Sequence, residues 1–280
     1  MPYVVLIIFL AIAFALQLLT GNIPISFLSF PLNLVLALIW AGSVYILWKT
    51  RRKSGFVGFM LSKAGTISSI LLFLTFSLVI GLTGKRNLVN TWVSAAVLLY
   101  FQTVLLFVVL RGCFQRFPDG KGKIRWRFLL NHAGLLLAVS SAFWGASDSD
   151  TLYVRAIKNH PVKEAIRNDG TGAWLPYDVE LKDFRMDEYD NGVPSMFEAD
   201  IVIDGKSVTL RVNEPYSVSF GSDIYLNGYD VASGADSSYC ILQIVREPWK
   251  YAAVAGILMM LAGAMLLFIN GPERRKTEDE

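Results

Sequence analysis

The hydropathy pattern of this 280-residue chain alternates long apolar runs with short polar segments. Six of the apolar runs are 17 to 19 residues long. That length is close to the roughly 20 residues that a helix needs to cross a hydrocarbon core about 30 Å thick. The pattern therefore predicts an α-helical integral membrane protein with about six spans. The predicted spans are Tyr3–Leu19, Leu32–Trp48, Ala64–Leu82, Trp92–Leu110, Phe128–Trp144 and Tyr251–Ile269.

Between the last two apolar runs, the periodicity changes to the alternation typical of β-strands. Residues 197–203 and 208–212 alternate on either side of Asp204-Gly205, which predicts a tight hairpin because Asp-Gly suits a type I′ turn. We expect an antiparallel β-sandwich or partial barrel. His160–Arg167 is the only segment here for which we expect a short helix. Further strands are expected at Leu152–Ile157, Asp178–Phe184, Ser217–Phe220, Asp223–Leu226 and Tyr239–Val245.

These two patterns divide the chain into four parts. Residues 1–145 are expected to form a membrane domain of five transmembrane helices, and residues 146–250 a β-sandwich-like domain. Residues 251–270 then form the sixth transmembrane helix, and residues 271–280 a short tail.

The loops on one side of the predicted membrane carry 14 Lys and Arg residues, and the short loops on the other side carry 2. The positive-inside rule places the basic side in the cytoplasm. Both termini are then cytoplasmic, and the β domain is extracytoplasmic. That domain has 18 Asp and Glu against 10 Lys and Arg. A nucleic-acid partner is not expected, because the basic residues lie in short membrane loops instead of gathering on one folded face.

No catalytic residue is predicted. The chain has no Cys-x-x-Cys, Gly-x-Ser-x-Gly or His-x-x-x-His motif, and the predicted topology puts Cys113 and Cys240 on opposite sides of the membrane. Cys240 lies among alternating apolar residues, so we interpret it as a small core residue. We expect His160, next to Pro161, to be a solvated surface residue. Whether the chain is an enzyme stays open, and we favour a role without catalysis of its own.

His132 is the only histidine, acidic or basic residue in the interior of any predicted span. Such a residue at membrane depth is costly, so it indicates a functional site. It lies about 7.5 Å along the helix from Arg127, near the cytoplasmic boundary. The alternative is a histidine that hydrogen-bonds a neighbouring helix and binds no ligand. Ala133 and Gly134 beside it leave space for a partner helix or a flat macrocycle.

The β segment resembles the outer domain of the ResB-type (CcsB) cytochrome c biogenesis proteins of system II. The similarity rests on the runs Tyr177–Phe184, Tyr189–Ser195, Phe197–Ile201, Val212–Pro215 and Ile224–Tyr229. The run Asn131–Leu137 resembles the family's helix before that domain, and the final apolar run resembles the helix after it.

This resemblance implies a subunit of a cytochrome c assembly complex in the bacterial inner membrane. Such proteins help to move haem across the membrane and deliver it to apocytochrome c outside. The expected partners are a CcsA/ResC-type membrane protein, apocytochrome c and thiol-reducing proteins. The implied cofactor is transiently bound haem b, with His132 as a ligand of the haem iron. Imidazole is a common axial ligand of haem.

Two other functions compete with this one. In the first, the chain is an extracytoplasmic binding or sensing module, and the helices merely anchor it in the membrane. The second is a secondary transporter, which usually has intramembrane acids, broken helices or related halves. The sequence shows none of these three features.

The topology can be tested with a reporter that is active only outside the cytoplasm, fused after Thr277. We expect the fusion to be inactive, because the 14 to 2 bias places the C-terminus inside. A fusion after Gly170 is the matched positive control. An active reporter after Thr277 would contradict the six-span topology.

Overall fold

The computed structural model describes residues 2–84, 86–114, 125–191 and 194–270. The chain divides into two compact units. The membrane unit consists of Met1–Ser147 and Lys250–Glu280, and the β unit consists of Asp148–Trp249.

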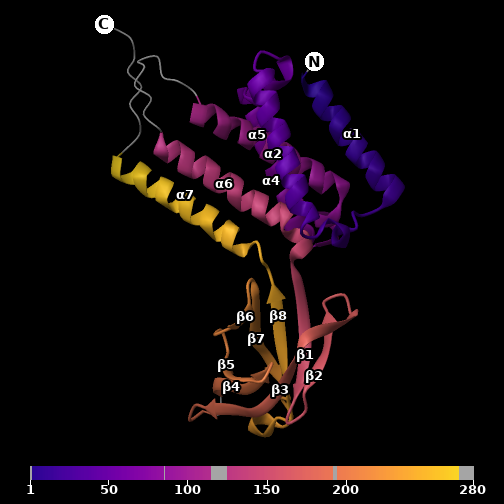
Figure 1. The fold of residues 1–280 in the computed structure, drawn as a ribbon, viewed down its shortest axis with the longest axis vertical. Helices are drawn as coiled ribbons and strands as arrows, with labels where there is room; N and C mark the ends of the chain where they lie inside the picture. The colour runs from indigo at the N-terminus through magenta and orange to yellow at the C-terminus, as the bar shows by residue number, and fades with distance from the viewer. Residues whose placement is uncertain (1, 85, 115–124, 192–193, 271–280) are drawn as a thin grey trace. The chain divides into compact units, whose positions relative to one another are not determined.

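The described part of the membrane unit is helical (Figure 1). Five helices, α1, α2, α4, α5 and α7, are long and apolar enough to cross a membrane. They match five of the six predicted spans, and they indicate a membrane protein. The helices are α1 (Pro2–Thr20), α2 (Leu32–Thr50), α3 (Gly55–Met60), α4 (Lys63–Thr83), α5 (Trp92–Phe114), α6 (Trp126–Trp144) and α7 (Lys250–Asn270).

The remaining predicted span forms helix α6, which is as long as α1 and α2 but more polar. Asn131, His132, Ser140 and Ser141 lie within it. Because of these residues, α6 lacks the continuous apolar character of the other five helices. The helix over Phe128–Trp144 is confirmed, and the count of six spans stays a prediction.

Helix α5 is the centre of the membrane unit. It contacts α1, α2, α3, α4 and α6, and more than half of its span is buried inside the protein. Helices α1, α2, α4 and α7 expose most of their apolar side chains. A helix that is apolar on all sides must be covered by other apolar material, so these surfaces suit lipid or a membrane partner.

The β unit forms one eight-stranded antiparallel sheet, with the order β5-β4-β3-β2-β1-β8-β7-β6. The first strand, β1, pairs with the last strand, β8, along its whole length, from Asp150 opposite Arg246 to Ile157 opposite Tyr239. The strands are β1 (Asp150–Ile157), β2 (Val162–Arg167), β3 (Gly172–Glu188), β4 (Pro194–Ile203), β5 (Lys206–Arg211), β6 (Tyr216–Ser219), β7 (Ser222–Tyr229) and β8 (Tyr239–Arg246).

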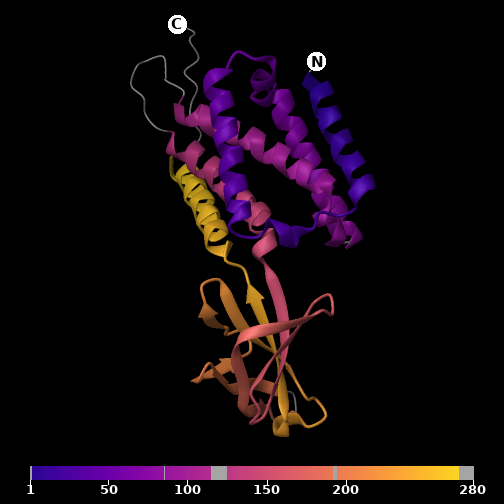
Figure 2. The same ribbon diagram turned by 45° about the vertical axis from the view of Figure 1, so that its right-hand side comes forward.

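This sheet curls around a single hydrophobic core (Figure 2). Buried side chains come from all strands except β6. Strand β5 contacts β7, although β4, β3, β2, β1 and β8 lie between them in the sheet order. An antiparallel sheet is therefore confirmed. The sandwich-like arrangement is not, because the strands form one continuous sheet.

The predicted hairpin at Asp204-Gly205 is confirmed. Ile203 pairs with Lys206 across the turn. Asp204 has φ 48° and Gly205 has φ 77°, the positive values that a type I′ turn requires at both central residues. The other predicted strands also form, although β3 extends well beyond Asp178–Phe184.

The expectation of a short helix at His160–Arg167 is wrong. Val162–Arg167 is strand β2, whose residue Ala165 is buried in the core. Ile166 lies opposite Tyr153 of β1, and Glu164 lies opposite Trp174 of β3. Pairing on both sides determines the conformation of this short segment.

Cys240 lies on β8 and is completely buried in the core. Burial raises the pKa of its thiol to about 12, because the charged thiolate would lose its hydration. The interpretation of Cys240 as a core residue is therefore confirmed.

Replacing Gly205 with valine should destabilise the β4–β5 hairpin by about 1 kcal/mol or more, since a β-branched residue is strained at positive φ. Hydrogen–deuterium exchange of the full-length protein would measure this as an increase of about fivefold at the β4–β5 amides. Gly172→Val is the control: Gly172 has no positive φ, and nothing lies within 4 Å of the position that a Cβ atom would take there. Equal exchange in both variants would contradict the turn assignment.

Candidate functional site around His132

His132 lies in the second turn of α6, which begins at Trp126. Its Nδ1 atom is 2.8 Å from the backbone carbonyl oxygen of Phe128, one turn earlier. The neighbouring Asn131 behaves alike, since its side-chain amide donates to the carbonyl of Arg127 at 2.9 Å. Two consecutive polar side chains are thus paired with their own helix, which reduces the cost of placing them in an apolar environment.

The bond to Phe128 determines which ring nitrogen of His132 carries the proton. A carbonyl oxygen only accepts hydrogen bonds, so Nδ1 must donate. In neutral imidazole, Nε2 is then unprotonated and has a lone pair available for a metal. No described residue forms a hydrogen bond to this Nε2. A backbone carbonyl on Nδ1 is a common arrangement for histidines that bind metals.

The ring of His132 stacks on the ring of Phe128, with centroids 4.1 Å apart and planes inclined by 24°. Phe128 in turn rests on Gly112 of α5, where a Cβ atom would lie 2.1 Å from the Phe128 ring. Residues four apart share one helix face. His132 is therefore held on the side of α6 that carries Phe128, and the absence of a side chain at Gly112 positions both rings.

Another face of α6 packs closely against α7, and Figures 1 and 2 show the two helices side by side. A Cβ at Gly134 would lie 2.6 Å from the carbonyl oxygen of Gly256, and one at Gly256 would lie 2.7 Å from the backbone nitrogen of Ala138. A Cβ at Gly263 would meet the side chain of Asn131 at 2.8 Å. The space at Gly134 thus receives a helix of this chain.

The described residues contain no group of three or more His, Cys, Asp or Glu side chains that could hold a metal ion. His160, the other histidine, belongs to the β unit, where it is exposed beside a turn. Asp187 and Glu188 lie near the end of β3 and are also exposed. His132 is thus the only imidazole in the described residues of the membrane unit.

A polar pair that the sequence patterns did not indicate lies between α5 and α6. Gln102 is fully buried, and its Oε1 accepts a hydrogen bond from Ser140 at 2.9 Å. The Nε2 of Gln102 and the Nε1 of Trp144 are buried without an acceptor among the described residues. An unsatisfied buried donor costs about 1–3 kcal/mol, so a water molecule or another acceptor would be favourable at either atom.

Four charged residues of the β unit form an ion-pair network. Arg211 and Arg185 both bind Glu198, and Arg185 also binds Asp200. Hydrogen bonds from Arg211 and then Arg185 lower the pKa of Glu198, and those from Arg185 and Thr209 lower that of Asp200. Both carboxylates are thereby held in their charged form. The network joins β3, β4 and β5, and it leaves neither acid ready to accept a proton near neutral pH.

Comparison with protein families shows that residues 121–240 match the ResB-like family. This segment is ResB-like. The match covers 120 of the 280 residues, including all of α6 with His132 and strands β1 to β7. The predicted resemblance to the ResB family is therefore confirmed for this segment.

No curated protein matches the chain. Among solved structures, the cytochrome c haem lyase CcmF is similar, with 14% sequence identity and a TM-score of 0.38. The similarity covers 71% of this chain and 34% of that protein, so this chain spans about a third of its length.

Replacing Gly134 with leucine should separate α6 from α7, because the new side chain would overlap the backbone of Gly256. Overpacking of this kind typically costs about 1–3 kcal/mol. The thermal unfolding midpoint of the purified protein in detergent should fall. Gly81→Leu in α4 is the matched control, since nothing lies within 4 Å of a Cβ there. Equal midpoints for the two variants would show that the helices do not pack at Gly134.

Proposed function

We propose that this chain is the ResB-type subunit of a cytochrome c assembly complex. It helps to move haem across the membrane and to deliver it to apocytochrome c on the outer side. The observation that carries this proposal is the ResB-like match over residues 121–240, which includes both α6 and most of the β unit. The chain acts in this proposal as a carrier within a complex, without catalysing the attachment by itself.

In this proposal, His132 is an axial ligand of the iron of transiently bound haem b. Three properties of the residue support the assignment. Its Nδ1 is bound to the carbonyl of Phe128, so Nε2 keeps the lone pair that iron requires. Phe128 holds the imidazole plane by stacking. The third property is position, because the residue lies in the membrane unit, one to two turns from the basic end of α6.

A single histidine suits a haem site that two subunits share. The second axial ligand would come from a CcsA/ResC-type membrane partner, since no second histidine lies in the described residues of the membrane unit. Apocytochrome c and thiol-reducing proteins are the further partners in this proposal. The proposed location is the bacterial inner membrane, and the loop charges support an orientation with the β unit on the periplasmic face.

The test is His132→Ala in the full-length chain, co-expressed with the proposed partner. The variant should lose the Soret absorbance of the purified protein and should fail to support c-type cytochrome maturation. Its thermal midpoint should change little, because the helix keeps its Gly134 contact with α7. Added imidazole should restore part of the absorbance, since it supplies the missing ligand.

His160→Ala is the matched control, because it also removes an imidazole but from an exposed turn. It should leave both the absorbance and maturation unchanged. Wild-type haem content and maturation in His132→Ala would exclude the ligand role. Two results together would favour the alternative of an anchored binding or sensing module. The wild-type protein would be purified without haem even when the partner is present, and cells that lack this protein would still mature their c-type cytochromes.

A further inference from the structure

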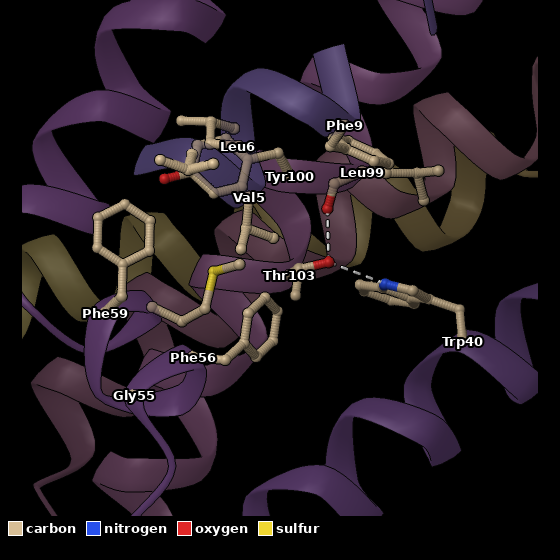
Figure 3. Close-up of a pocket in the computed structure, with 12 residues that line it drawn as sticks. Val5, Leu6, Phe9, Trp40, Gly55, Phe56, Phe59, Leu99, Tyr100 and Thr103 are labelled. Atoms are coloured by element: carbon tan, nitrogen blue, oxygen red, sulfur yellow. Dashed lines mark hydrogen bonds between the residues drawn. The ribbon is translucent and has the colours of Figure 1, made fainter. Parts of the chain in front are cut away.

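A cavity of about 510 Å³ opens in the membrane unit, at a distance in sequence from the ResB-like segment. Helices α1, α2, α3 and α5 form its walls (Figure 3). Val5 and Phe9 come from α1, Trp40 from α2, Phe56 from α3 and Leu99 from α5. The proposed haem ligand His132 is not among the residues that line this cavity, so the cavity is separate from the candidate site around His132.

The walls of the cavity offer hydrocarbon contacts and few polar atoms. Trp40 donates its indole N–H to the hydroxyl of Thr103 at 3.1 Å, and Thr103 donates to the carbonyl of Leu99 at 2.6 Å. The hydroxyl of Tyr100 lies 2.8 Å from that of Ser68 and 3.2 Å from the carbonyl of Gly65. The polar side chains that line the cavity are therefore paired within the protein. An apolar chain fits such a space better than a polar solute, which would lose its hydration there.

Basic residues directly precede helix α3, one wall of the cavity, in the sequence. Helix α2 ends at Thr50, and a tight turn follows in which the amide of Ser54 donates to the carbonyl of Arg51 at 2.9 Å. Gly55, the next residue, already lines the cavity. Lys53 is two residues before Gly55, so their Cα atoms are at most about 7.6 Å apart. The side chains of Arg51 and Lys53 are both exposed.

These cations have no acidic residue near them in sequence. The first Asp or Glu of the chain is Asp119. None occurs at 125–147 or 250–270 either, so the described residues of the membrane unit contain no carboxylate side chain. Clusters of Lys and Arg at the end of a membrane helix attract anionic lipid headgroups. An apolar cavity beside such a cluster matches an anionic lipid, because the cavity suits the acyl chain and the basic residues suit the headgroup.

We propose that this cavity is a binding site for an anionic phospholipid. One acyl chain lies between α1 and α5, against Phe9 and Leu99, and the phosphate binds at Arg51 and Lys53. The lipid would add to the direct contacts that α1 already makes with α3 and α5.

Native mass spectrometry of the full-length protein can test this site. The delipidated protein would be mixed with equal amounts of dioleoyl phosphatidylglycerol and dioleoyl phosphatidylcholine. We expect preferential retention of one phosphatidylglycerol. The double variant Arg51→Gln, Lys53→Gln should reduce its affinity on the order of thirtyfold, since each cation near a membrane surface contributes about fivefold. Equal retention of both lipids by the wild-type protein would overturn the proposal.

Two glycines of α3 provide a matched pair for the chain-binding half of the site. Nothing lies within 4 Å of a Cβ at Gly55 or at Gly58, but only Gly55 lines the cavity. Gly55→Leu should reduce phosphatidylglycerol retention, whereas Gly58→Leu should leave it unchanged. Equal retention in these two variants would show that the lipid binds elsewhere. Displacement of the bound lipid by added haem, with a Soret band that Gly55→Leu removes, would identify haem as the occupant and overturn the lipid assignment.

Discussion

The close packing of α6 against α7 is the contact on which the rest of the molecule depends. These two helices flank the whole β unit in the sequence, so their pairing brings the two ends of that inserted segment together. The fold of the β unit also brings its two ends together, because its first and last strands are neighbours in the sheet. Trp249 also donates its indole N–H to Asp148 at 2.6 Å, which joins the two ends of the unit. Adjacent termini are what an inserted domain requires.

Helix packing also determines which side chains of α6 are used for contacts with neighbouring helices and which are available to a ligand. Asn131, Gly134 and Ala138 face α7, and Phe128 faces Gly112 of α5. His132 is oriented by its own helix through the carbonyl of Phe128. A ligand whose orientation comes from local backbone keeps that orientation when partners associate or leave. This property suits a site that must accept and release its cargo, which is the behaviour required in the proposed function.

The sequence predicted most of the fold because its signals are local. Apolar runs determine the membrane helices, and the Asp204-Gly205 pair determines a hairpin through its own backbone preferences. Strand β2 was missed because its conformation depends on its pairing with β1 and β3. His132 was selected because a histidine within an apolar run would be costly at membrane depth, and its role as a ligand stays a prediction. Its tautomer, its support from Gly112 and the cavity at Trp40 depend on distances between helices, which no local pattern encodes.

The burial of Cys240 has a consequence for redox chemistry. Only the thiolate attacks disulfides, and a thiol with a pKa of about 12 is ionised in about one molecule in 10⁵ at neutral pH. The β unit contains no other cysteine. A client with a reactive Cys-x-x-Cys pair could therefore lie against this sheet without forming a mixed disulfide with it. Cys240 is thereby kept out of thiol exchange twice over, because its sulfur is buried and because its thiol stays protonated.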